Sequence, residues 1–225
     1  MTSREKFDII NSNVKKSAEK SGRKAADITV LAVTKTVSVD RILPVLDMGI
    51  TEIGENYVQE LCEKYDALKE KVEKFHFIGH LQTNKVKYII DKVSLIHSVD
   101  RMSLLTEINK RADAVNKIQD ILIEVNMTKE ETKSGVYLEN LEELLKSAEE
   151  LPNISVKGFM TMPPAYFSKE EAAAVYKKLA DISKNIKTNG SILSMGMSGD
   201  YEKAIENGSN LIRLGALIFG KRNII

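Results

Sequence analysis

A lysine closes an apolar, β-branched run near the start of the sequence. Lys35 ends the segment from Thr29 to Lys35, and strand alternation places it on the same face as Leu31 and Val33. If that face lines the inside of a barrel, burial disfavours the charged amine and lowers its pKa. A neutral amine attacks an aldehyde or a ketone and forms a Schiff base. From position alone, a solvated lysine at the end of a strand is the commoner case. Assigning Lys35 as a Schiff-base lysine therefore needs a second observation.

An arginine supplies that observation. Arg213 lies inside the otherwise apolar run from Leu211 to Gly215, where a permanently charged guanidinium needs a partner. One alternative is an ion pair with a carboxylate on a neighbouring strand. The other is an anionic ligand, because the last strand of a closed barrel lies beside the first. Two cations on one wall favour the neutral lysine and attract an anion.

Two short glycine-containing segments are candidates for phosphate binding. Ser198 and Gly199 follow the seventh apolar run, and Gly215 and Ala216 follow the arginine. Ser198 has a simpler alternative role as the N-cap of the short helix that comes next. In the functional alternative, its hydroxyl and the free N–H groups at the helix start bind phosphate. Barrels often bind phosphate in the loops after strands 7 and 8, so the two segments converge.

Other site chemistries have weaker support. His76 and His80 are four residues apart, but they lie in a strand pattern, whereas a His-Glu-x-x-His metal site requires a helix. His97 lies in another strand, so we expect no metal site and interpret His80 as a polar pocket residue. The single Cys62 gives neither a disulfide framework nor a zinc ribbon. The Gly-x-Ser-x-Gly segment of the hydrolase elbow is absent from the sequence.

Apolar runs alternate with helical patterns along the whole chain. The expected strands are Thr29 to Lys35, Glu52 to Asn56, Phe75 to Gly79, Leu95 to Asp100, Ile121 to Asn126, Val156 to Met162, Ile192 to Met197 and Leu211 to Leu214. The expected helices include Arg4 to Lys20, Val39 to Met48, Val58 to Val72 and Leu138 to Glu149. This alternation predicts βαβ units and a parallel sheet.

The fold that we expect is α/β, a single (β/α)8 TIM barrel with an extra N-terminal helix, in one domain spanning residues 1–225. An open doubly wound sheet is the alternative, but no Gly-x-Gly-x-x-Gly segment follows the first strand. The expected strand ends carry Lys35, Asn56, His80, Asp100, Asn126, Thr161, Ser198 and Gly215. This set is rich in nitrogen and poor in carboxylates, which favours an anionic ligand.

Composition narrows the function classes. The 225 residues include 33 Lys+Arg and 32 Asp+Glu, and a net charge of +1 indicates no nucleic-acid or anionic-membrane partner. No apolar run approaches the ~20 residues of a membrane span, and the N-terminus lacks the apolar stretch of a signal peptide. We therefore expect a cytoplasmic protein.

The motifs resemble those of the pyridoxal-phosphate homeostasis proteins (the YggS/PROSC family), which are similar to the N-terminal barrel of bacterial alanine racemase. The resemblance covers essentially the whole chain. It rests on Leu31 to Lys35, Gly54 to Glu60, Phe75 to Lys85, Gly158 to Met162, Leu193 to Asp200, and Arg213 to Gly220.

The resemblance implies a role for each candidate residue. It implies that pyridoxal 5'-phosphate (PLP) is held as a Schiff base on Lys35 and that Arg213 faces the pyridine nitrogen. It also implies that the phosphate lies in a cup formed by Ser198, Gly199, Gly215 and Ala216. Asn56 and His80 would lie near the ring. Many relatives carry Thr or Ser where this chain has Ala216, so a hydroxyl contact to phosphate is lost while the backbone N–H remains.

The function implied is intracellular PLP homeostasis without catalytic turnover. PLP enzymes that build carbanions usually protonate the ring nitrogen, whereas an arginine keeps it unprotonated and weakens the electron sink. Alanine racemase takes its second base from a C-terminal domain of the partner subunit, which this sequence is expected to lack. We therefore expect a monomer, with PLP, amino acids and PLP-dependent apo-enzymes as partners. The alternatives are a small PLP-dependent amino-acid racemase and a Schiff-base aldolase acting on a phosphorylated sugar.

Overall fold

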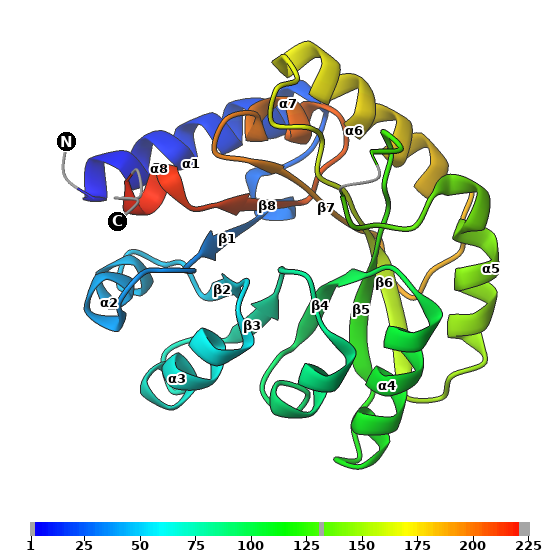
Figure 1. Cartoon of the computed structure of the whole chain (residues 1–225). Helices are drawn as coiled ribbons and strands as arrows, with labels where there is room; N and C mark the ends of the chain where they lie inside the picture. Colours follow the sequence, from blue (N-terminus) through cyan, green and yellow to red (C-terminus); the bar gives the residue numbers. More distant parts are fainter. Residues whose placement is uncertain (1–2, 131–132, 221–225) are drawn as a thin grey trace.

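The computed structural model, which describes residues 3–130 and 133–220, is a closed barrel of parallel strands ringed by helices (Figure 1). The strands follow one another around the barrel in chain order. They are β1 (Thr29–Val33), β2 (Glu52–Glu55), β3 (Lys74–Phe77), β4 (Leu95–Val99), β5 (Gln119–Glu124), β6 (Ile154–Met160), β7 (Ile192–Met197) and β8 (Leu211–Leu214). The ladder between β8 and β1 closes the sheet. The predicted TIM barrel is confirmed, and the open doubly wound alternative is wrong.

Helices follow most of the strands. The α-helices are α1 (Ser3–Lys20), α2 (Val39–Leu46), α3 (Val58–Leu68), α4 (Met102–Asp113), α5 (Leu138–Glu149), α6 (Lys169–Ser183), α7 (Tyr201–Glu206) and α8 (Ala216–Phe219). Two 3-10 helices, η1 (Ala25–Asp27) and η2 (Thr83–Tyr88), complete the elements. In the described ranges, no helix is both long and apolar enough to cross a membrane.

Side chains alternate between two cores. A small inner cluster fills the barrel, and its buried members are Leu31, Leu95, Leu122, Met160 and Leu211. Their neighbours along the strands, such as Ala32 and Ile212, belong to the larger core between the sheet and the helices. The predicted alternation is therefore confirmed for Leu31.

Most of the predicted strands extend past the residue at which the observed strand ends. Ile192–Met197 and Leu211–Leu214 match the prediction, but β1 ends at Val33 and β5 ends at Glu124. The reason is that the chain leaves the barrel ladder for other partners. For example, the N–H of Asn126 donates to the carbonyl of Val136 in the following loop, at 2.9 Å.

The predicted N-terminal helix is confirmed as α1, which lies along α7 and α8 (Figure 1). Its buried face carries Ile10, Val14 and Ala18 at helical spacing. Asn13 Nδ2 donates to the Tyr201 hydroxyl at 3.1 Å and so ties α1 to α7. The extra helix thus covers the outside of the β7–β8 segment that carries the predicted phosphate residues.

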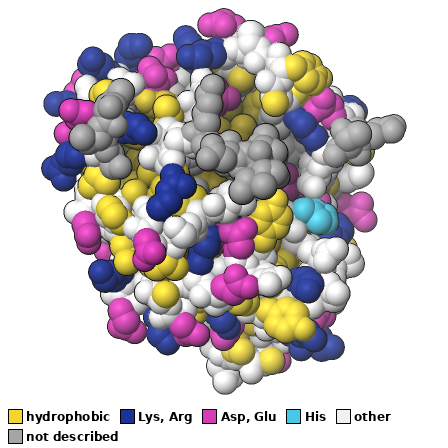
Figure 2. Space-filling view, turned by 60° about the vertical axis from the view of Figure 1, so that its left-hand side comes forward, with side chains coloured by type: hydrophobic (Ala, Val, Ile, Leu, Met, Phe, Trp, Pro, Cys, Tyr) yellow, Lys and Arg dark blue, Asp and Glu magenta, His cyan; other side chains and the backbone are white. Residues whose placement is uncertain are grey.

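One face of the molecule carries both signs of charge side by side. Figure 2 shows Lys and Arg interspersed with Asp and Glu over the described atoms of one face, with smaller apolar areas between them. This distribution matches the near-zero net charge of the chain.

Candidate functional site

The segment after β1 presents Lys35 at the carboxyl end of the barrel. Beyond Val33, the Thr34 N–H still donates to the Gly54 carbonyl at 3.0 Å, so the chain leaves the sheet only at the lysine. Thr36 then takes a positive φ of 61°, which turns the chain toward α2. Lys35 is half-buried at this turn.

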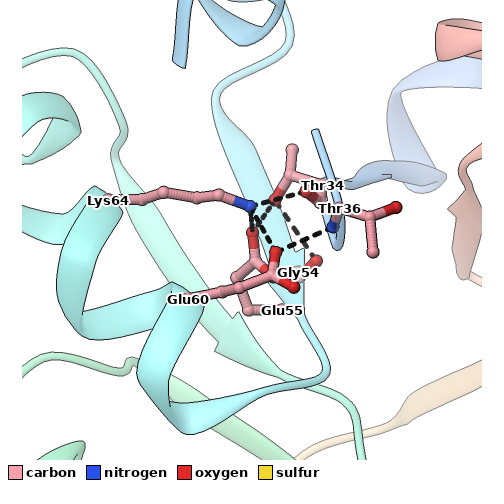
Figure 3. Close-up of polar contacts among 6 residues, drawn as sticks. All are labelled: Thr34, Thr36, Gly54, Glu55, Glu60 and Lys64. Atoms are coloured by element: carbon pink, nitrogen blue, oxygen red, sulfur yellow. Dashed lines mark hydrogen bonds and ion pairs between the residues drawn. The ribbon is translucent and has the colours of Figure 1, made fainter. Parts of the chain in front are cut away.

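Helix α3 holds the backbone on both sides of the lysine (Figure 3). Lys64 Nζ donates to the Thr34 carbonyl at 2.8 Å, and Glu60 Oε2 accepts from the Thr36 N–H at 2.7 Å. Lys64 also pairs with Glu60 at 2.8 Å. The residues before and after Lys35 are therefore fixed by one ion-pair cluster.

A buried carboxylate completes this cluster. Glu55 is 1 % exposed, and its Oε1 accepts from Lys64 Nζ at 2.8 Å and from Thr34 Oγ1 at 2.6 Å. Burial raises the pKa of Glu55 despite the opposing contacts from Lys64 and Thr34. Its Oε2 has no hydrogen-bond partner in the described structure. The cluster is a rigid support for the lysine segment and a costly one to disrupt.

Arg213 lies on the strand next to that of the lysine, in register with Leu31. It is 5 % exposed, and its guanidinium donates to the Ser194 carbonyl at 2.7 Å, to Ser194 Oγ at 2.6 Å and to the Thr161 carbonyl at 3.2 Å. Burial lowers its pKa, with smaller opposing effects from nearby acidic groups. Among the described residues, its partners are therefore two carbonyls and a hydroxyl, and it forms no ion pair with a carboxylate.

The loops after β7 and β8 meet. The Leu217 N–H donates to Ser198 Oγ at 3.3 Å, and Gly215 is the N-cap of α8. Asp200, not Ser198, is the N-cap of α7, so the capping role considered for Ser198 is wrong. Among the described residues, the N–H groups of Ser198, Gly199, Gly215 and Ala216 in these loops donate no backbone hydrogen bond. A side chain built on Gly199 would meet nothing within 4 Å, so its backbone is open to a ligand.

A buried tyrosine supports the first of these loops from below. Tyr176 donates to Asp200 Oδ2 at 2.7 Å, and Asp200 Oδ1 accepts from the Met197 N–H at 2.7 Å. Burial and the neighbouring Asp200 raise the pKa of Tyr176, which stays protonated as the donor. These contacts fix the turn at Ser198 and Gly199.

Asn56 and His80 line one groove beside the barrel mouth. Asn56 is half-buried, and its Oδ1 is buried without a hydrogen-bond partner in the described structure. Gly79 lies so close that an added Cβ would approach the Asn56 carbonyl to 2.2 Å, so only glycine fits there. His80 is exposed, and its Nδ1 lies 3.2 Å from Ser134 Oγ. The groove brings both predicted residues together, with Asn56 nearer the interior.

Two of the predicted rim residues bind backbone instead. Asn126 Nδ2 donates to the Glu130 carbonyl at 2.9 Å, and Thr161 Oγ1 donates to the Val125 carbonyl at 2.9 Å. Both are buried and hold the loops after β5 and β6 in place.

Sequence reasoning missed a carboxyl group beside the arginine. Glu124 is 6 % exposed, and its pKa rises to about 7 because of burial and the nearby Asp100, an effect that Arg213 partly offsets. Alternation from Leu122 through Glu124 to Asn126 was the available signal, since it places the three on one face. The site therefore contains a group that titrates near neutral pH.

Comparisons with known proteins show the family of this chain. The family described as "Alanine racemase, N-terminal domain" matches residues 7–223. A protein of Aquifex aeolicus named pyridoxal phosphate homeostasis protein is 44% identical over 226 residues, covering 99% of both chains. One of the same name from Escherichia coli K12 is 34% identical over 95% of this chain and 94% of that protein.

The solved structures include PipY of Synechococcus elongatus with PLP bound. It matches with a TM-score of 0.82 at 24% identity, over 91% of this chain and 100% of that one. This likeness concerns the fold. The closed barrel and the matched family model together define a barrel of the alanine racemase N-terminal type. Within that class, the chain belongs to the pyridoxal phosphate homeostasis protein family.

Proposed function

We propose that this protein binds PLP at the carboxyl end of the barrel and holds it as a Schiff base on Lys35. The observation that carries the proposal is Arg213, a buried cation without a carboxylate ion pair among the described residues, on the strand beside that of the lysine. The relatives named for PLP homeostasis and the fold neighbour solved with PLP support the same assignment.

The arginine fits a pyridine nitrogen. A guanidinium has five N–H groups, and the three bonds to Ser194 and Thr161 leave two for a ligand within the described structure. Because Arg213 only donates, it suits an unprotonated ring nitrogen. The buried Oδ1 of Asn56, which has no hydrogen-bond partner among the described residues, adds an acceptor at the end of β2, the strand beside β1.

The two loops fit a phosphate group. In the part of the chain that the structure describes, the N–H groups of Ser198, Gly199, Gly215 and Ala216 lack backbone partners. The contact between Ser198 and Leu217 joins the loops that carry them. Backbone donors of this kind bind anions well. We assign the phosphate cup to these residues together with Gly215.

The covalent link follows from the lysine. Bound PLP supplies an aldehyde that reacts reversibly with primary amines. Lys35 would hold the cofactor there, because a neutral amine can condense with this aldehyde with loss of water. The ion-pair cluster of Lys64, Glu55 and Glu60 keeps the segment around the amine in place.

We further propose that the protein holds PLP in reserve, open to exchange with amino acids and apo-enzymes, as a cytoplasmic monomer. The curated relatives are named for homeostasis and not for a reaction. One observation favours the racemase alternative, which is the buried Glu124 with a pKa of about 7, a value suited to a proton-transfer group.

An absorption titration with PLP tests the binding proposal. Wild type and Lys146→Ala should develop the same visible band, because Lys146 is an exposed lysine on α5 that pairs with Glu142, outside the proposed site. Lys35→Ala should show only the spectrum of free PLP. A band of wild-type strength in Lys35→Ala would overturn the assignment.

Exchange of the α-hydrogen of alanine in deuterated water separates the two functions. A reservoir should show no exchange above that of free PLP with the amino acid. Steady exchange by wild type that Glu124→Gln abolishes would establish the racemase alternative in its place.

A further inference from the structure

Two buried histidines touch inside the barrel. His76 on β3 and His97 on β4 are 2 % and 0 % exposed, and His76 Nδ1 lies 2.9 Å from His97 Nε2. The other nitrogen of His97, Nδ1, lies 2.9 Å from Ser194 Oγ on β7, across the barrel. The described partners of His97 are therefore polar atoms on both sides, although an apolar side chain would fill this space at lower desolvation cost.

The contacts continue in both directions. Ser194 Oγ accepts from the Arg213 guanidinium at 2.6 Å. At the other end, His76 Nε2 makes no regular hydrogen bond in the described chain, but it lies 3.2 Å from Glu52 Oε2. We call Glu52, His76, His97 and Ser194 the histidine chain.

The histidine chain ends at the opposite mouth of the barrel. Glu52 and His76 line a cavity of about 230 Å³ together with first residues of other strands, such as Thr29 and Leu211. Glu52 Oε1 also pairs with Lys74 at 2.8 Å there. The histidine chain thus leads from the amino ends of the strands to Arg213 in the proposed cofactor site.

Hydrogen-bond chemistry assigns one direction to the protons. Ser194 Oγ accepts from Arg213, so its single proton is free to point at His97 Nδ1. A neutral His97 then carries its proton on Nε2 and donates to His76 Nδ1. His76 in turn carries its proton on Nε2, facing the carboxylate of Glu52. Each donor in this order has an acceptor.

The electrostatics agree with that order. Burial, together with the nearby charge of Arg213, lowers the pKa of His97 well below 6.5, so His97 is neutral. Burial opposes ionisation of Glu52, but contacts from His76 and Lys74 outweigh it and lower the pKa to about 2. The histidine chain therefore connects the cation of Arg213 with the anion of Glu52.

We propose that the histidine chain is a positioning device that orients the Arg213 guanidinium and balances its buried charge through Glu52. The inference rests on the proposed function, because Arg213 matters there as the group that faces the ring nitrogen. Glu52, His76, His97 and Ser194 act through the arginine and not on the ligand. Removing the charge of Glu52 should then alter the ring environment from the far end of the barrel.

The first experiment uses the protein without PLP. Nitrogen-15 NMR of histidine-labelled protein should show the proton on Nε2, and not on Nδ1, in both rings. A proton on Nδ1 of either ring would reverse the donor order and overturn the proposal. This result does not depend on whether PLP binds.

The second experiment uses PLP labelled with nitrogen-15 in its ring. Glu52→Gln should shift the ring-nitrogen resonance relative to wild type, and Ser194→Ala should shift it in the same direction. Asp120→Asn is the matched control, because Asp120 lines the same cavity outside the histidine chain and should leave the resonance unchanged. Thermal melts verify that each variant folds.

The outcomes are distinguishable. A wild-type resonance in Glu52→Gln, or an equal shift in Asp120→Asn, would contradict the positioning role. If wild type fails to bind PLP, the proposed function fails, while the proton order in the unliganded protein still tests the chain itself.

Discussion

The ammonium of Lys64 donates a 2.8 Å hydrogen bond to the carbonyl of Thr34, the residue before Lys35. The carboxylate of Glu60 accepts the N–H of Thr36, the residue after it. Helix α3 therefore fixes the segment that presents the lysine, and β1 alone does not. Because α3 holds the backbone on both sides of Lys35, less conformational entropy is lost when the lysine binds a ligand.

Lys64→Met should destabilise the fold by about 3 kcal/mol, because it leaves Glu55 buried without its cation. Urea unfolding measures the change. Lys69→Met is the control, since the exposed pair of Lys69 with Asp66 should be worth under ~0.5 kcal/mol.

The double variant Lys64→Met/Glu55→Gln separates stability from placement. It should recover most of the lost stability, because the unpaired carboxylate is gone, yet still bind PLP more weakly than wild type. Wild-type affinity in the double variant would show that the cluster does not position Lys35.

Glu124 makes stability depend on pH. Its folded pKa of about 7 lies above the ordinary value of 4.5, so the folded state binds more protons than the unfolded state between these values. Its contribution is therefore fully present below about pH 4.5 and is lost as the pH rises through 7. Glu124→Gln should be more stable than wild type by about 3 kcal/mol at pH 8, with little difference at pH 4.5. Urea midpoints at both pH values test this, and an equal difference at both would refute the assignment.

Ala216→Thr should tighten PLP binding by about tenfold or less, because it adds a hydroxyl beside the phosphate cup. Ala216→Val, which has the same shape without the hydroxyl, should not. Pyridoxal, which lacks the phosphate, should bind both variants equally. A gain for pyridoxal as well would place the new contact away from the phosphate.

Much of the fold follows from the sequence because its signals are local. Strand and helix periodicity along the chain predicts the barrel, and charged residues in apolar runs single out Lys35 and Arg213. The strand ends are less well predicted, since the point where β5 leaves the ladder depends on Val136, a residue of the following loop.

Side-chain partners across the barrel could not be predicted. His97 and Ser194 are 97 positions apart and meet only because β4 and β7 face each other over the interior. The role of Ser198 depends likewise on Leu217, which the sequence alone does not place beside it. Such contacts depend on strand tilt and register around the whole barrel, which no local pattern encodes.

The central claim is that PLP is attached to Lys35. Borohydride reduction of the PLP-loaded protein, followed by peptide mapping, tests it most directly. The account predicts one pyridoxyl-phosphate adduct, on the peptide that contains Lys35, and its loss in Lys35→Ala. An adduct on another lysine, or none on wild type, would contradict it.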